Sequence, residues 1–204
     1  MASRTLTKGQ RTRERIVREA GELFNVQGYA GTSVADVSAA VGLEKGGVYN
    51  HFESKDALAL ACFDRAAEDV LARMQRAVAP HANAWDRIQA IFDLYVRLTD
   101  RATVKGGCPI LNTALEADDT HPALAARARA ALKSWRKMLA GIIDDGIAAG
   151  EFRTPAPADV ATTIVAGIEG GMMLSKIAGD AAPMRTVTAQ LTVYLHAALS
   201  RAAR

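Results

Sequence analysis

Residues 32–55, TSVADVSAAVGLEKGGVYNHFESK, decide the fold of this chain. Ser33 is a good N-cap for a first helix, and Asp36, three residues later, favours the first turn of that helix. Gly42 allows a sharp turn, and a second short helix is expected from about Lys45 to Phe52. Two short helices joined by a tight turn are typical of a helix-turn-helix, whose second helix enters the major groove of DNA.

Helical spacing separates the residues of this stretch into an inner and an outer set. The apolar residues that pack the two helices are Val34, Val37, Ala40, Val41, Leu43, Val48 and Phe52. The outer face is left with Lys45, Gly46, Gly47, Tyr49, Asn50 and His51. Lysine donates to guanine, and tyrosine, histidine and lysine hold phosphates, so we predict DNA contact. The alternative is structural: Tyr49 would be a core ring with its hydroxyl at the surface, and His51 would cap a helix end.

Positive charge gathers at the N-terminal end, although the formal net charge of the whole chain is only +3. Residues 1–18 have one acidic side chain, Glu14, and the basic side chains Arg4, Lys8, Arg11, Arg13, Arg15 and Arg18. Such clustering is an electrostatic footprint for phosphate. Without the motif downstream, it would indicate only a solvated terminus.

The rest of the 204 residues indicates an all-α protein, because half are hydrophobic and strand-like alternation is absent. About nine helices are expected, among them 8–27, 54–78 and 158–178, with further helices beginning near residues 85, 109, 122 and 183. No apolar run approaches the roughly 20 residues that span a bilayer. No signal peptide is recognisable, and two cysteines make no disulfide framework, so we expect a cytoplasmic protein.

Two sequence patterns resemble the TetR family of transcriptional regulators. One is F-x-x-x-G-Y-x-x-T-S-V-x-D-V at residues 24–37, and the other is G-L-x-K-G-x-V-Y-x-H-F-x-S-K-x-A-L at residues 42–58. The resemblance is close over about the first quarter of the chain. It implies a DNA-binding domain over residues 1–54 and a helical effector-binding and dimerisation domain over residues 55–204.

By position, the resemblance also implies roles at the DNA. The base-reading positions of the family fall on Ala35, Lys45, Gly46 and Gly47, and the phosphate positions fall on Ser33, Tyr49, His51 and Lys55. Asn50 suits either role. Alanine and glycine offer almost no hydrogen-bonding side chain, so we expect Lys45 to be the main direct reader, with DNA shape supplying the rest.

The resemblance further implies a homodimer on an inverted-repeat operator, paired through the last two long helices. The sequence agrees, because the helix near 158–178 is apolar on more than one side and so needs two partners. The residues predicted at this interface are Ile164, Ile168, Leu191, Tyr194 and Leu195. The alternative is a monomeric core helix.

A small-molecule effector is implied as well, in a cavity inside the helical body. The candidates for its apolar lining are Phe63, Phe92, Tyr95, Leu111, Leu115, Trp135, Met138, Met172 and Met173, and the polar candidates are Asn112, Glu116 and Glu169. Each of these residues, taken singly, is also consistent with an ordinary role in packing the hydrophobic core. Glu169 would bind a polar or cationic ligand group, or else face solvent at the edge of the bundle.

Cys108 suggests an alternative way of sensing. Pro109 at the first position of a helix would leave Cys108 at the N-cap, where the helix dipole and Lys105 favour a thiolate that oxidants or electrophiles attack. The competing interpretation is a small buried residue. An enzyme using Cys108 or Glu169 is the less favoured alternative, since neither has a partner group set by motif.

Metal and cofactor binding are not expected, because the four histidines lie far apart in the sequence. The sequence therefore predicts a homodimeric, sequence-specific repressor released from DNA by a small molecule. Sequence-independent DNA compaction is disfavoured, because the basic residues are concentrated at one end of the chain.

Overall fold

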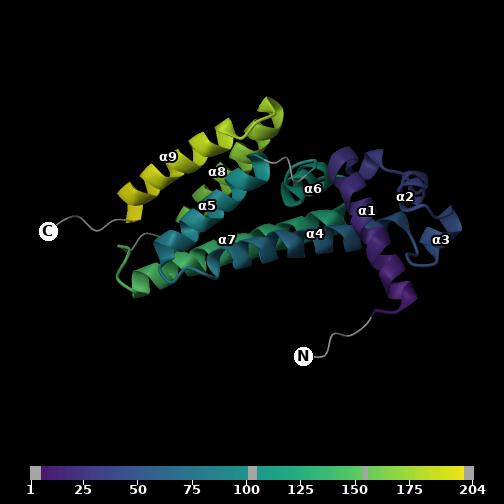
Figure 1. Cartoon of the computed structure of the whole chain (residues 1–204), viewed down its shortest axis with the longest axis horizontal. Helices are drawn as coiled ribbons and strands as arrows, with labels where there is room; N and C mark the ends of the chain where they lie inside the picture. Colours follow the sequence, from purple (N-terminus) through teal and green to yellow (C-terminus); the bar gives the residue numbers. More distant parts are fainter. Residues whose placement is uncertain (1–5, 101–104, 154–155, 200–204) are drawn as a thin grey trace. The chain divides into compact units, whose positions relative to one another are not determined.

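The structure is a computed structural model that describes residues 6–100, 105–153 and 156–199. Every regular element in that part of the chain is a helix, which confirms the predicted all-α class (Figure 1). The helices are α1 (Lys8–Gly31), α2 (Val34–Val41), α3 (Lys45–Tyr49), α4 (Lys55–Val78), α5 (Ala84–Asp100), α6 (Pro109–Ala117), α7 (Pro122–Ala148), α8 (Pro157–Ala178) and α9 (Ala182–Leu199). Arg4, one of the predicted basic residues, lies outside the described residues.

Two helices differ from the predicted bounds. The α1 helix continues to Gly31 rather than ending near residue 27, but Gly28 interrupts it with a φ of 78°. The predicted stop is therefore a kink, after which the chain makes one more turn. The α3 helix ends at Tyr49, earlier than predicted, because the next residues form a turn in which the His51 N–H donates to the Val48 carbonyl at 3.0 Å.

The chain forms two compact units. Unit 1 comprises the residues up to 68 together with 109–129, so it contains α1, α2, α3, the first part of α4, α6 and the start of α7. Unit 2 comprises 69–108 and 130–204, with the rest of α4 and α7 and with α5, α8 and α9. The division of function at residue 54 stays a prediction.

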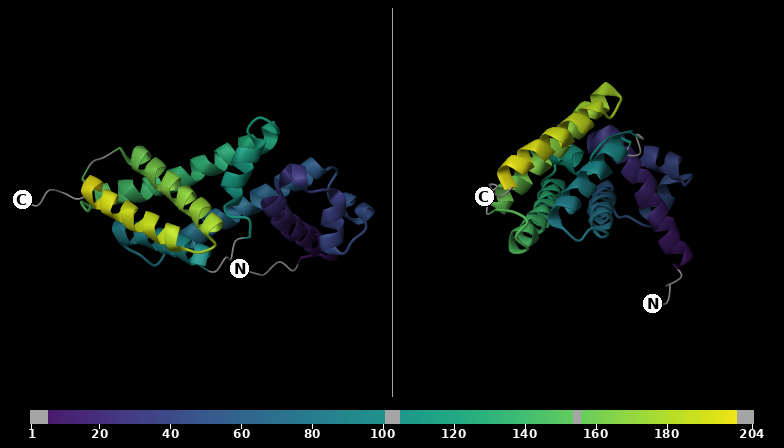
Figure 2. Two further views of the ribbon diagram at one scale, coloured as in Figure 1. Left: turned by 90° about the horizontal axis from the view of Figure 1, so that it is seen from above. Right: turned by 60° about the vertical axis from the view of Figure 1, so that its left-hand side comes forward.

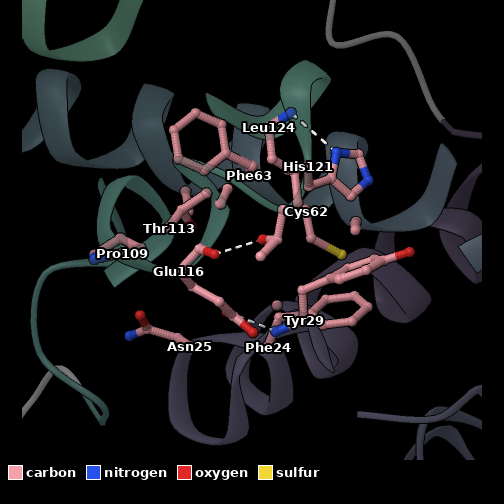
Figure 3. A pocket seen from close by; sticks show the side chains of 15 residues that line it. Phe24, Asn25, Tyr29, Cys62, Phe63, Pro109, Thr113, Glu116, His121 and Leu124 are labelled. Atoms are coloured by element: carbon pink, nitrogen blue, oxygen red, sulfur yellow. Dashed lines mark hydrogen bonds between the residues drawn. The ribbon is translucent and has the colours of Figure 1, made fainter. Parts of the chain in front are cut away.

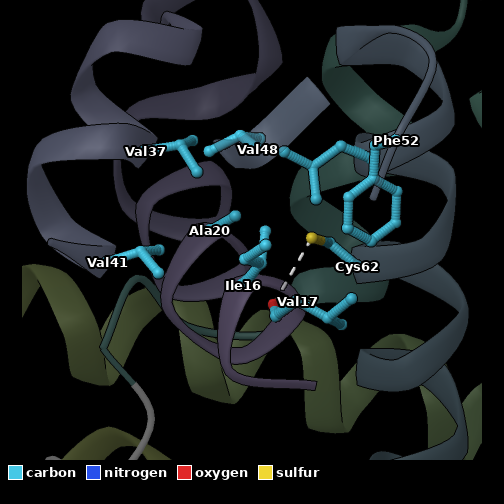
Figure 4. Close-up of a cluster of buried hydrophobic side chains, with 9 residues drawn as sticks. Ile16, Val17, Ala20, Val37, Val41, Val48, Phe52 and Cys62 are labelled. Atoms are coloured by element: carbon cyan, nitrogen blue, oxygen red, sulfur yellow. Dashed lines mark hydrogen bonds between the residues drawn. The ribbon is translucent and has the colours of Figure 1, made fainter. Parts of the chain in front are cut away.

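The core of unit 1 joins the helix-turn-helix to α1 and α4 (Figure 4). Its buried residues are Ile16, Val17, Ala20, Val37, Val41, Val48, Phe52, Leu58 and Cys62. The Cys62 thiol donates to the Val17 carbonyl at 3.4 Å, and burial raises the pKa of Cys62 to about 12. Cys62 is thus a neutral core residue, which fixes α4 against α1.

Unit 2 is built around α8, which packs along α9 and against α5, as both views of Figure 2 show for the paired α8 and α9. Glycines allow the close approach of α8 and α9. A Cβ at Gly167 would lie 2.8 Å from Leu191 Cδ1, and a Cβ at Gly171 would lie 3.0 Å from Met184 Sδ. Gly167 and Gly171 therefore serve the packing of α8 against α9 within one protomer.

By length and hydropathy alone, α8 meets the requirement for crossing a membrane, which the sequence did not lead us to expect. Half of its apolar window is buried inside the protein, and the buried carboxyl side chain of Glu169 lies within the same helix. These properties are those of a core helix, and α8 serves as one in unit 2.

Candidate functional site

Local hydrogen bonds define the helix-turn-helix. The Ser33 hydroxyl accepts from the Asp36 N–H at 3.2 Å, and the Asp36 carboxylate accepts from the Ser33 N–H at 2.8 Å. Hydrogen bonds from Ser33 hold the pKa of Asp36 below its ordinary value. After α2, Gly42 adopts a φ of 69° and turns the chain toward α3. The capping box and the left-handed glycine thus place α3 where the sequence predicts it.

The outer face of α3 is open. Lys45, Gly46 and Asn50 are exposed, and Tyr49 is 50% exposed, whereas Val48 is buried in the core. A Cβ added to Gly46 would meet no atom within 4 Å. The predicted burial is confirmed for Val37, Val41, Val48 and Phe52, whereas Ala40, which was predicted to pack the first helix of the motif, is exposed.

The remaining predicted DNA residues differ in accessibility. Ser33 and Ala35 are exposed at the start of α2, whereas Gly47, His51 and Lys55 are half-buried. A Cβ at Gly47 would lie 3.3 Å from Leu43 Cβ, so this glycine also serves packing inside the motif. The DNA contacts of all these residues stay predictions.

Lys55 contacts an aromatic ring that the sequence pattern alone does not assign to the site. Its Nζ lies 4.1 Å from the centre of the Tyr29 ring, a cation–π contact. The Tyr29 hydroxyl donates in turn to Asp56, and burial, followed by this hydrogen bond, raises the pKa of Tyr29 to about 12. The ammonium group of Lys55 is thereby oriented beside the helix-turn-helix. The Gly28–Tyr29 pair within the motif was the available signal.

Glu116 of α6 binds the backbone of the helix that precedes the helix-turn-helix. Its Oε2 accepts from the Tyr29 N–H at 2.8 Å, and its Oε1 accepts from the Ala30 N–H at 2.9 Å (Figure 3). These two N–H groups follow the kink at Gly28. A Cβ at residue 28 would lie 2.7 Å from Glu116 Oε1, so only glycine permits this contact.

Gly28→Ala is expected to lower the free energy of unfolding by about 2–3 kcal/mol, since it combines a strained φ with displacement of the Glu116 carboxylate. Gly42→Ala is the matched control, because Gly42 has a similar φ of 69° but open space around it. Chemical denaturation of both variants measures the difference. Equal losses in the two variants would show that the Glu116 contact contributes nothing.

Unit 1 contains a small cavity of about 40 Å³, lined in part by Phe24, Tyr29, Phe63 and His121 (Figure 3). The His121 ring meets Tyr29 edge-on at 4.9 Å, and its Nε2 lies 3.8 Å from the Asp56 carboxylate. A cavity of about 150 Å³ holds a benzene molecule, so this space is too small for a ligand of that size.

The predicted effector-pocket residues fall in both units. Phe63, Leu111, Asn112 and Leu115 belong to unit 1, whereas Phe92, Tyr95, Trp135, Met138, Glu169, Met172 and Met173 belong to unit 2. The Asn112 amide donates to Asn25 Oδ1 at 2.9 Å, so it has a structural partner. Leu115 is 74% exposed and Met173 is 50% exposed. These two lie on the surface rather than in an interior lining, because each occupies the outward side of its helix.

Unit 2 holds a buried cluster of polar and aromatic side chains. The Tyr95 and Trp135 rings stack with centres 5.7 Å apart and planes 9° apart. Glu169 is 6% exposed, and burial raises its pKa to about 7, with the Cys108 thiol opposing part of that rise. Burial also raises the pKa of Tyr95 well above 10. The alternative of a solvent-facing Glu169 is therefore wrong.

Cys108 immediately precedes α6, as predicted, and it is 5% exposed. Oxidants and electrophiles need access to a thiol, so its burial fits the structural interpretation rather than the sensor. Among residues 6–100, 105–153 and 156–199, no three His, Cys, Asp or Glu side chains form a group that could hold a metal ion.

The predicted interface residues need correction. Ile164, Ile168 and Leu195 have 0% exposure and Leu191 has 8%, because α8 and α9 bury these side chains inside the protomer. Among the five, Tyr194 is open to a partner, at 43% exposure. The large apolar side chains exposed on α8 and α9 are Met173, Leu174, Ile177, Val193 and Tyr194.

Comparison with known proteins extends the similarity over nearly the whole chain. The family described as bacterial regulatory proteins, tetR family, matches residues 16–62, and the tetracyclin repressor-like C-terminal domain matches residues 84–191. The transcriptional repressor DhaR of Mycobacterium sp. (strain GP1) is 27% identical, over 84% of this chain and 86% of that protein.

Two solved structures are also similar. A TetR transcriptional regulator from Chloroflexus aurantiacus is 46% identical, covers 95% of this chain and 98% of its own, and has a TM-score of 0.90. A TetR-family regulator from Cytophaga hutchinsonii is 33% identical, covers 97% and 100%, and has a TM-score of 0.88. With its exposed α3 and its helical body, the chain belongs to the TetR family and is a DNA-binding transcriptional regulator.

Proposed function

We propose that the protein is a cytoplasmic, homodimeric repressor that binds an inverted-repeat operator and leaves it when a small molecule binds inside unit 2. The observation that supports this most is the open outer face of α3, which offers Lys45, Gly46 and Tyr49 to DNA. The relative DhaR is named a repressor, which supports the direction of regulation.

Direct reading of bases would fall to the N-terminal end of α3. Lys45 donates to guanine O6 and N7, and Gly46 lets the backbone approach the groove because it has no side chain. Tyr49, His51, Ser33 and Lys55 would hold phosphates around this point, with Lys55 already oriented by Tyr29. The phosphate contacts would set the register in which Lys45 reads its base pair.

Gly46→Ala is expected to weaken operator binding by roughly tenfold or more, because the added methyl group would occupy the space that DNA needs. The free protein should become slightly more stable, by about 0.5–1 kcal/mol, since alanine favours a helix. Gly141→Ala in α7 is the matched control, because its Cβ also meets no atom within 4 Å. Unchanged operator affinity of Gly46→Ala would exclude close approach at this glycine.

Dimerisation would use the exposed apolar side chains of α8 and α9. A two-fold axis presents the same patch on both protomers, so Ile177 and Val193, at 77% and 63% exposure, would become buried. Burial of about 100 Å² of apolar surface contributes about 2.5 kcal/mol, so burying a few such side chains would stabilise the dimer.

Ile177→Asp is expected to shift the protein toward monomers, since it would place a charge in that patch. Sedimentation velocity measures the change, and operator affinity should fall with it, because one half-site alone binds weakly. Val26→Asp is the control: Val26 of α1 is 56% exposed but belongs to unit 1. A dimer that survives Ile177→Asp unchanged would place the interface elsewhere.

Release by the effector is a linkage between two sites. An effector that weakens operator binding 100-fold requires a coupling of about 2.7 kcal/mol, and the operator then weakens effector binding by the same factor. Titrating an effector with and without operator DNA tests this equality.

A further inference from the structure

Glu169 is a buried carboxyl group in the middle of an apolar helix. It is 6% exposed, and neither of its oxygens meets the geometric criteria for a hydrogen bond to a described residue, so that the nearby Cys108 thiol supplies at most a weak S–H donor. A buried carboxylate without a partner costs several kcal/mol, and such groups are normally paired. In the free protein, the Glu169 carboxyl group therefore lacks a strong hydrogen-bond donor or a positive charge beside it.

Two side chains from other segments of unit 2 lie near Glu169, and Tyr95 connects it to two more. Tyr95 of α5 and the Cys108 thiol are close enough to influence its charge or to be influenced by it. Trp135 of α7 stacks on Tyr95, is 1% exposed, and has an indole N–H with no acceptor among the described residues. The Tyr95 hydroxyl has a weak sulfur acceptor, Met74 of α4, at 3.8 Å.

This set of groups discriminates between ligand classes. A carboxylate attracts cations and repels anions, and the faces of stacked aromatic rings also attract cations. A metal ion would need several hard ligands, whereas Glu169 supplies one carboxyl group. The positive side chain acting on this cluster is Arg73, whose charge affects Tyr95.

We propose that Glu169 anchors a cationic effector, an organic ammonium whose N–H donates to the Glu169 carboxylate and whose apolar body packs against Tyr95 and Trp135. The assignment rests on the proposed effector-released repressor and names the chemical class of its ligand. Glu169 supplies the charge, and the two stacked rings supply the apolar contact.

Cation binding should also release a proton from Glu169. Burial raises the pKa of Glu169 to about 7, and Tyr95 stays neutral because its pKa lies well above 10. A bound ammonium favours the ionised carboxylate, so its affinity should rise between pH 5 and pH 8. An alkyl ammonium resembles that of lysine and keeps its charge over this range.

Isothermal titration calorimetry with matched probes tests the assignment. The probes are phenethylammonium, 2-phenylethanol and 3-phenylpropanoate, with octylammonium, 1-octanol and nonanoate as a second set. We expect both ammonium ions to bind, with the alcohols and carboxylates much weaker. Glu169→Gln should weaken ammonium binding at least about tenfold, because the amide removes the negative charge that would pair with the ammonium ion. Asp159→Asn, an exposed site on the same helix, should have no effect.

Three results would each overturn the assignment. They are the absence of binding of either ammonium ion at millimolar concentration, binding of the alcohols as tight as that of the ammonium ions, and ammonium binding to Glu169→Gln that is unchanged. Thermal unfolding shows whether the variant is folded. Operator release is measured separately: Glu169-dependent ammonium binding without release would contradict the repressor switch alone. Release by compounds that do not depend on Glu169 would contradict the ammonium assignment alone.

Discussion

Glu169→Gln is expected to raise the free energy of unfolding at pH 8 by about 2–3 kcal/mol. The folded protein holds the Glu169 pKa at about 7, above the ordinary value of 4.5. The folded state therefore binds this proton more tightly than the unfolded chain does. The resulting stability is fully present below pH 4.5 and is lost as pH rises to about 7. Glutamine resembles the neutral form and does not titrate.

Urea denaturation between pH 5 and pH 8 measures this difference. The variant and the original protein should be close in stability at pH 5 and diverge toward pH 8. Asp159→Asn controls for removing an exposed carboxylate from the same helix, and it should show no such divergence. If the difference in stability between Glu169→Gln and the original protein stays constant with pH, Glu169 titrates normally and its burial does not disfavour the ionised form.

Removing the Lys45 side chain is expected to lower operator affinity by about 10- to 100-fold and to reduce discrimination at one base pair of each half-site. Lys45 is exposed at the start of α3, and the glycine that follows it offers no side chain to share the task. Fluorescence anisotropy on the operator and on variants of each base pair measures both effects of Lys45→Ala.

Two further variants distinguish base-specific recognition from sequence-independent binding to DNA. Lys137→Ala removes an exposed lysine of α7 in unit 2 and should leave binding unchanged. Tyr49→Ala should weaken binding to all sequences alike, since a phosphate contact carries no sequence information directly. Full discrimination retained by Lys45→Ala would mean that another residue, or DNA shape, reads that base pair.

The helix-turn-helix could be predicted in detail because its determinants are local. Ser33 and Asp36 form the capping box three residues apart, and Gly42 adopts the left-handed turn that its lack of a side chain permits. The apolar residues of α2 and α3 alternate with helical period, so the buried Val48 and the exposed Tyr49 follow from spacing alone.

The body could not be predicted to the same depth, because its packing depends on contacts distant in sequence. The α8 helix is apolar around most of its circumference, so periodicity does not say which side faces α9. For this reason, periodicity did not indicate that Ile164 and Ile168 lie inside the protomer and that Ile177 is exposed. Glu116 and the backbone of Tyr29 are 87 residues apart, and no local pattern indicates that they meet.

Selection of bound DNA from a random duplex library, at moderate salt, tests the central claim most directly. A homodimeric repressor should enrich an inverted repeat whose half-sites are centred about one helical turn, 34–36 Å, apart. Glu169 and the effector play no part in this step. Folded dimeric protein, purified free of ligand, that enriches no sequence would contradict operator recognition by α3.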